Sequence, residues 1–130
     1  MNIEKVMKEL KQKYPGKEIF QNDKIKPTEI ICEIEPTTEH PEYSIAVAVI
    51  VRSILHYHKM TEEVYEIIKG ELKLYVDGKL IILKTGEKYL IKPGMRHYAL
   101  GQETWVKTTA RPGWIANDHH LVSLGETYET

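Results

Sequence analysis

The segment HYHKMTEE, residues 56–63, holds two histidines and a glutamate at a spacing that can bring them together. On a strand, His56 and His58 would point to the same face, roughly 7 Å apart along the backbone. Two imidazoles so placed can bind one ion, and a carboxylate five residues later can return across a turn as a third ligand. One more histidine from a distant strand would complete a mixed site suited to Zn, Fe, Mn, Ni or Co.

The spacing continues into a second segment. Six residues separate Glu63 from Gly70, and five separate Gly86 from Lys92-Pro93-Gly94-Met95-Arg96-His97. The pattern from His56 to Gly70 resembles the first sequence motif of the cupin family, and residues 86–97 resemble the second. The connecting residues 71–85 have the compact length that small cupins show.

The resemblance covers about residues 43–109, and most of the chain if flanking strands are counted. It implies an all-β fold, a double-stranded β-helix of the jelly-roll type, with a metal near the mouth of the barrel. Carried over position by position, the ligands of one divalent ion would be His56, His58, Glu63 and His97. We therefore expect residues 1–130 to form a single domain, most similar to small single-domain cupins of no assigned activity.

Glu62 competes with Glu63 for the carboxylate position, because the family tolerates three or four residues after the second histidine. Strand alternation favours Glu63, which then shares the inward face with Tyr65 and keeps the spacing to Gly70. Elsewhere the sequence departs from the family pattern at turns and strand ends, so no ligand position is lost. Those departures are Ile50 in place of a glycine, Lys92 in place of a proline and Gly101 in place of an asparagine.

The composition is that of an ordinary globular domain, with 42% hydrophobic and 28% charged residues. A net charge of -1 leaves no positive excess for phosphate backbones, so we expect no nucleic-acid partner. No run approaches the ~20 apolar residues of a membrane-spanning helix, so we expect no membrane association. The single cysteine, Cys32, forms no internal disulfide, and a cytoplasmic protein is the default expectation.

Outside the motifs, hydrophobic periodicity predicts one helix followed by short strands. Residues 3–14 have the apolar spacing of an amphipathic helix within a helical segment 1–15, which we expect to cover the barrel. Asp77-Gly78 predicts a hairpin turn. The predicted strands are 28–34, 43–51, 62–69, 71–76, 79–84, 87–91, 95–100, 103–109 and 121–124.

The strand 43–51, YSIAVAVIV, is apolar on both faces. Such a strand lies between two layers or at a subunit contact. Because that apolar face is large for a chain of this size, we expect a homodimer.

Several other residues have both a functional and a structural interpretation. Tyr65 and Glu62 are candidates for a proton donor or base, although a tyrosine buried with one hydrogen bond fits Tyr65 equally well. Three arginines could hold an anionic substrate, although exposed arginines are common. We interpret Asp118-His119-His120 as a polar turn, His40 as exposed and Trp114 as a packing or lid residue. The arginines are Arg52, Arg96 and Arg111.

A metal held by three histidines and one glutamate keeps up to two open positions, which a small-molecule substrate can occupy. With Zn, Mn or Ni, such an ion can polarise a carbonyl group, which favours a metal-dependent isomerase or epimerase acting on a sugar-like hydroxy-carbonyl compound. With Fe, the same site suits a mononuclear non-haem dioxygenase. A non-catalytic cupin that binds a small ligand or a metal is the third hypothesis.

Overall fold

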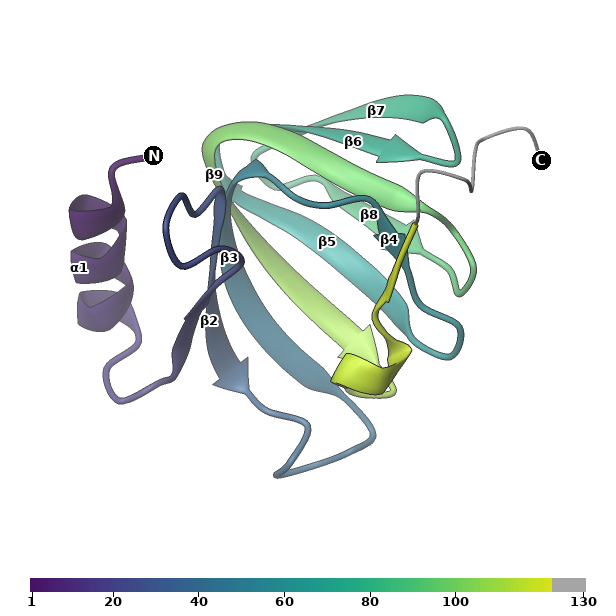
Figure 1. The fold of residues 1–130 in the computed structure, drawn as a ribbon, viewed down its shortest axis with the longest axis horizontal. Coiled ribbons are helices and arrows are strands. Elements are labelled where there is room, and N and C mark those ends of the chain that lie inside the picture. The colour runs from purple at the N-terminus through teal and green to yellow at the C-terminus, as the bar shows by residue number, and fades with distance from the viewer. Residues whose placement is uncertain (123–130) are drawn as a thin grey trace.

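The computed structural model describes residues 1–122, in which ten strands form one strongly curled sheet and a single α-helix lies outside it (Figure 1). The sheet therefore has the β-barrel, jelly-roll character expected from the sequence. Its elements in chain order are α1 (Ile3–Lys13), β1 (Ile19–Gln21), β2 (Glu29–Glu35), β3 (Ser44–Arg52), β4 (His56–Tyr57), β5 (Glu62–Lys69), β6 (Glu71–Val76), β7 (Lys79–Lys84), β8 (Lys88–Ile91), β9 (His97–Arg111), the 3-10 turn η1 (Ala116–Asp118) and β10 (His120–Leu121).

Strand β9 joins the two layers of the barrel. Its C-terminal half pairs with β3 and β5, in a layer ordered β1-β2-β3-β9-β5-β8. Its N-terminal half pairs with β4 and β6, in a layer ordered β10-β4-β9-β6-β7. All these pairings are antiparallel. Figure 1 shows β9 running across the barrel and folding back, so that both of its ends lie on the same side.

The two strands predicted at 95–100 and 103–109 form one continuous strand of 15 residues, so that prediction was wrong. The chain turns a corner without leaving the ladder, because its pairing with β3 shifts register between Ile50 and Arg52 and Glu103 adopts a φ of 53°. A Cβ at Gly101 would lie 2.5 Å from Thr104 Oγ1 and 2.9 Å from the Ile50 carbonyl oxygen. The corner therefore needs a residue without a side chain.

Helix α1 covers the outer face of the β2-β3-β9 layer. The Asn2 side chain caps its N-terminus by accepting a hydrogen bond from Lys5 N at 3.2 Å. Val6 and Leu10 are buried, and they share an apolar cluster with residues of the sheet. The sheet residues in this cluster include Ile30, Cys32, Val47, Val49 and Trp105.

Strand β3 is buried on both faces, as its composition predicted. Ala48 and Ile50 face the barrel core, whereas Val47 and Val49 face α1 and are 3% and 0% exposed. The helix of the same chain thus covers the face from which we expected a homodimer. That argument for dimerisation is removed, and the oligomeric state stays a prediction that sedimentation can test.

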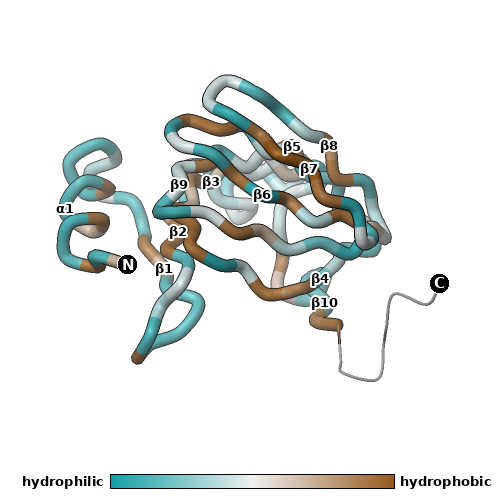
Figure 2. The backbone as a smooth tube through the Cα atoms, turned by 90° about the horizontal axis from the view of Figure 1, so that it is seen from above, coloured by the Kyte–Doolittle hydropathy of each residue, from teal (hydrophilic) through white to brown (hydrophobic). Residues whose placement is uncertain are grey.

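The remaining expectations concern the chain ends and membranes. The strand expected at 121–124 is seen as the two-residue β10, ending at Leu121, while residues 123 and 124 lie outside the described part of the chain. Figure 2 shows α1 at one end of the molecule and the β4–β10 pair near the other. Within residues 1–122, α1 is too short to cross a bilayer and no longer apolar helix is present.

Candidate metal centre

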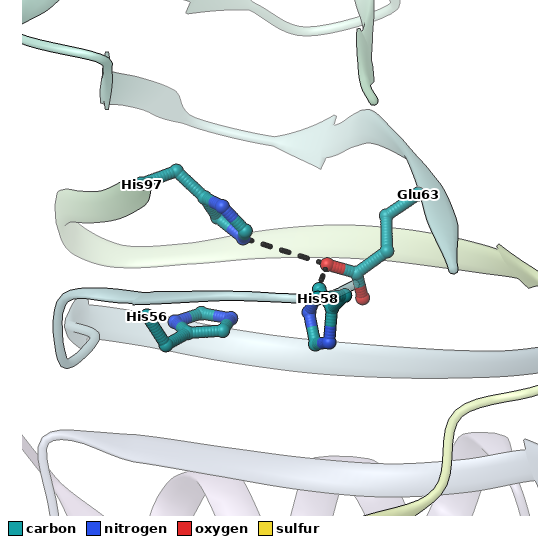
Figure 3. A group of neighbouring side chains, drawn as sticks. All are labelled: His56, His58, Glu63 and His97. Atoms are coloured by element: carbon teal, nitrogen blue, oxygen red, sulfur yellow. Dashed lines mark ion pairs between the residues drawn. The ribbon is translucent and has the colours of Figure 1, made fainter. Parts of the chain in front are cut away.

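Four buried side chains from separate segments meet at one end of the barrel (Figure 3). His56 lies on β4, His58 directly follows it, Glu63 is on β5 and His97 begins β9. His97 is completely buried, and none of the four is more than 7% exposed. One ligand atom from each residue lies within 4.8 Å of the others. These are the four residues that the cupin resemblance implied.

Each histidine ring is held in one orientation by the backbone. A carbonyl oxygen can only accept, so each Nδ1 carries the proton and each Nε2 keeps a free lone pair. Rings oriented in this way are ready to bind a metal through Nε2. The Nδ1–oxygen distances are 2.7 Å from His56 to Ile54, 2.9 Å from His58 to Asp118 and 2.9 Å from His97 to Met95.

The Glu63 carboxylate completes the cluster. Its Oε1 lies 2.9 Å from His58 Nε2 and 3.5 Å from His97 Nε2 (Figure 3). Neither contact is a hydrogen bond, so the three atoms are buried without a hydrogen-bond partner. Buried polar atoms left unpaired are rare and call for an explanation. A cation at their centre would satisfy all three, and the residues therefore fit a divalent metal.

The protonation states of two ligands also suit a metal. Burial would raise the pKa of the Glu63 carboxyl, but His58 and His97 beside it hold that pKa well below its usual range. Burial, helped by His97, lowers the pKa of His56 to about 3, so this imidazole is neutral at pH 7. Burial would lower the pKa of His58, but neighbouring Glu63 raises it. A cation bound at the His58 Nε2 would compete with protonation of this ring.

Asp118 supports the site from a distant part of the chain. Its backbone carbonyl accepts the His58 Nδ1–H, as described above. Its carboxylate accepts backbone N–H bonds from Lys59 at 2.8 Å, from Met60 at 3.1 Å and from Thr61 at 3.0 Å. It therefore fixes the turn that separates ligand His58 from ligand Glu63. Of the turn predicted at residues 118–120, Asp118 ends η1 and His120 begins β10. No sequence pattern indicates this role of Asp118, because the contacting residues are some sixty positions apart.

His119, which we interpreted only as part of that turn, lies beside the cluster. Its ring centroid is 4.4 Å from that of His56 and 5.6 Å from that of His58. Its Nδ1 is buried without a hydrogen-bond partner. The Trp114 ring, 42% exposed, lies 5.8 Å from His119. His119 is thus a neighbour of the ligands at the cavity wall and is not one of the four.

A cavity of about 360 Å³ opens onto this cluster. His56 and Glu63 reach it directly, and His119 and Trp114 form part of its wall. A volume of this size suits a small organic molecule. Two of the four clustered side chains therefore border a space that a small molecule could enter.

The two predicted acid–base residues are placed differently. Tyr65 lines the cavity and is 5% exposed. Burial, followed by the charges of Glu63 and Glu29, raises the pKa of Tyr65 well above its usual value, so its hydroxyl stays protonated. Glu62 does not line the cavity, because strand alternation turns it to the face opposite Glu63.

The three arginines considered for an anionic substrate do not line the cavity. The Arg96 guanidinium lies 4.4 Å from the centre of the Tyr57 ring, and that of Arg111 lies 5.3 Å from the centre of the Tyr43 ring. Arg52 is exposed at the end of β3. His40, expected to be exposed, is half-buried and stacks on Tyr43 with ring centroids 3.9 Å apart.

Glu29 is a cavity residue that the sequence analysis missed. It lies on β2, where Ile30 and Cys32 pack toward α1 while Glu29, Ile31 and Glu33 line the cavity. Burial, together with the charge of Glu63, raises the pKa of Glu29 to about 7. The alternation in EIICEIE, residues 29–35, was the signal that could have revealed an inward carboxyl group.

Comparison with known proteins agrees with this architecture. A family model described as "Cupin domain" matches residues 47–104, which include all four clustered residues. Residues 47–104 form a cupin domain. Its cluster of three histidines and one glutamate occupies the positions given by the two sequence motifs, and the glycine at position 101, where the family pattern has asparagine, belongs to the β9 corner.

Solved structures of low sequence identity share the cupin fold. Pac13 from Streptomyces, described as a nucleoside dehydratase, is 14% identical with a TM-score of 0.71, over 87% of this chain and 92% of that chain. An RmlC-like cupin from Shewanella frigidimarina is 16% identical with a TM-score of 0.63, over 78% and 88% of the two chains. The iron(II) protein HppE is 11% identical with a TM-score of 0.61, over 74% and 56%.

Proposed function

We propose that this small cupin is a metal-dependent enzyme that moves a proton next to the carbonyl group of a small hydroxy-carbonyl compound, as isomerases and epimerases do. One observation carries the proposal: three imidazole nitrogens and one carboxylate oxygen converge within 4.8 Å at the wall of a cavity. Metal-dependent enzymes occur among proteins of this fold, and one of the similar structures, HppE, is described as an iron(II) protein.

His56, His58, Glu63 and His97 would hold the ion. Four protein ligands leave two positions of an octahedral ion open, and the cavity lies on the side of His56 and Glu63. When bound, a divalent ion supplies Lewis-acid stabilisation of negative charge that develops on a carbonyl oxygen. The fixed Nδ1–H bonds of the three histidines keep the ligand nitrogens in place as that charge develops.

The cavity residues supply the proton chemistry. With its pKa near 7, the Glu29 carboxyl can accept a proton from a carbon acid and return it near neutral pH. Tyr65, which stays protonated, can donate a hydrogen bond to a substrate oxygen. Glu62 receives no role in this scheme, because its side chain lies on the other face of β5.

The test begins with metal analysis of the full chain, purified without affinity tags or chelators. The protein is then loaded in turn with Mn, Zn, Ni and Fe(II) and incubated with a panel of sugars in deuterated water. We expect one ion per chain and exchange of a substrate C–H proton for deuterium, seen by NMR.

The variant Glu29→Gln should keep one ion per chain and lose exchange by about 10²–10⁴-fold, the usual contribution of a positioned acid–base group. Glu62→Gln is the matched control and should exchange at the wild-type rate. Substrate-dependent oxygen uptake with iron would instead establish a dioxygenase, and tight binding without turnover under every metal would establish a binding protein. Either result would overturn the proposal.

A further inference from the structure

The cavity wall carries negative charge without a matching cation. Three carboxyl groups line it, from Glu29, Glu33 and Glu63. Among the described residues that line the cavity, none is a lysine or an arginine. An anionic ligand entering this space would thus meet like charges and no bidentate cationic partner of the kind that holds phosphates and carboxylates.

Further acidic residues lie near Glu33. Burial raises the pKa of the Glu33 carboxyl, and the charges of Glu18 and Glu39 raise it further. The Glu33 backbone N–H donates to the Glu18 carbonyl oxygen at 2.9 Å, so Glu18 lies beside Glu33 and adds to the negative potential there. Such a potential lowers the local concentration of anions and slows their entry.

A bound metal would not reverse this balance. The two positive charges of a divalent ion are compensated by the ligand Glu63 and by one further carboxylate such as Glu33. No positive surplus remains for the two negative charges of a phosphate monoester. Any ionisation of Glu29 adds another negative charge to the wall.

The rest of the wall suits an uncharged ring compound. Phe20 and Trp114 both line the cavity and are 45% and 42% exposed, so their ring faces are available to a ligand. Aromatic faces pack against the apolar faces of sugar and base rings, and carboxylates accept hydrogen bonds from hydroxyl groups.

We propose that the cavity takes uncharged, hydroxyl-bearing ring compounds such as free sugars, that it rejects their phosphate esters, and that Glu33 sets this specificity. The inference rests on the site of the proposed function and names the class of its substrate. Glu33 acts through its charge on the cavity wall, outside the four metal ligands and the proton-transfer group.

The test compares matched pairs of ligands on the full chain loaded with the metal found in the native protein. Glucose is paired with glucose 6-phosphate and fructose with fructose 6-phosphate, and dissociation constants are measured by calorimetry or NMR titration. We expect at least one neutral member to bind, with its phosphate ester at least tenfold weaker. The ratio of the dissociation constant of the ester to that of the neutral compound should fall as the salt concentration rises, because salt screens the charges.

Two variants separate the role of Glu33 from a general charge effect. Glu33→Lys should narrow the ratio at least fivefold, and Glu33→Gln, which keeps the shape of the side chain, should give a smaller change in the same direction. Glu71→Lys makes the same change in net charge at an exposed position outside the cavity wall and should leave the ratio unchanged. Circular dichroism confirms that each variant is folded.

Tighter binding of the phosphate ester, absence of binding by both neutral compounds, or equal effects of the two lysine variants would overturn the substrate class. The proposed function fails separately, when neutral ligands bind selectively but show no C–H exchange with any metal. The proposed function holds without the substrate class when phosphorylated sugars bind more tightly than free sugars and undergo C–H exchange.

Discussion

The Nδ1–H of His58 is donated to the backbone carbonyl of Asp118, 2.9 Å away and sixty residues later in the chain. The carboxylate of Asp118 accepts backbone N–H bonds from the turn Lys59–Thr61, and this turn leads to Glu63. The geometry of two metal ligands therefore depends on a turn near the end of the described chain.

We expect Asp118→Ala to weaken metal binding about 10–100-fold, as loss of a supporting residue around metal ligands typically does. The free energy of unfolding of the metal-free protein should also fall, by about 1–3 kcal/mol, because buried N–H groups lose their acceptor. Competition with a chelator and urea denaturation measure the two quantities. His120→Ala removes a 3.6 Å ion pair with Asp118 and a ring contact with Tyr57 but none of these N–H bonds, and it serves as the control. Wild-type affinity in Asp118→Ala would contradict the supporting role.

Asp118 also predicts a dependence of stability on pH. Burial would raise the pKa of its carboxyl, but the N–H bonds from residues 59–61 lower it below the usual value. A carboxyl group whose pKa is lower in the folded state stabilises that state above its unfolded pKa of about 3.9, and the effect is lost as pH falls through the folded value.

The difference in unfolding free energy between metal-free wild type and Asp118→Asn should therefore be constant from about pH 7 to pH 5 and shrink in more acidic solution. Urea denaturation at a series of pH values measures it. If the difference in unfolding free energy stays constant or grows in acidic solution, the lowered pKa of the Asp118 carboxyl is contradicted.

The ligand set predicts which histidine variants lose metal. His58→Ala should lower the bound metal sharply while leaving the fold largely intact. His119→Ala should keep one ion per chain, because His119 neighbours the ligand cluster without belonging to it. His40→Ala, on the distant loop, is the second control. Elemental analysis measures the number of metal ions per chain in each purified variant, and an unchanged number in His58→Ala would count against the site.

Gly101→Ala should destabilise the fold by about 3 kcal/mol, at the upper end of the usual cost of overpacking. The new methyl group would overlap Thr104 Oγ1 and the Ile50 carbonyl oxygen. Gly16→Ala is a suitable control, because nothing lies within 4 Å of the added Cβ and only its positive φ carries a cost of about 1 kcal/mol. Thermal and urea denaturation compare the two, and equal losses would mean that the corner accommodates a side chain.

The sequence predicted the parts of the site that are local in the chain. The spacing from His56 to Gly70 and from Gly86 to His97 carried the cupin resemblance, and that resemblance implied the four clustered residues. The helix could also be predicted from neighbouring residues, because its apolar residues recur with the helical period and its cap, Asn2, directly precedes it.

What the sequence could not predict depends on distant contacts. Asp118 and His119 reach the site only because the chain after β9 returns to β4. No local sequence pattern predicts this long-range contact. The cavity position of Glu29 was not predicted, because only the β-branched residues of β2 were used to predict a strand. The alternation of residues along that strand places the Glu29 carboxyl group inward. The homodimer was inferred from an apolar face that α1 covers, since local patterns do not reveal which element packs on a strand.

The corner in β9 has a mechanical consequence for the metal centre. Opposite ends of this one strand are hydrogen-bonded to the two ligand strands, with His97 paired to His56 and Ala110 paired to Glu63. Separating the ligands therefore requires the barrel to peel away from a strand that is continuous through both layers. On the β9 side, the clustered residues are therefore held by strand pairing and not by a loop.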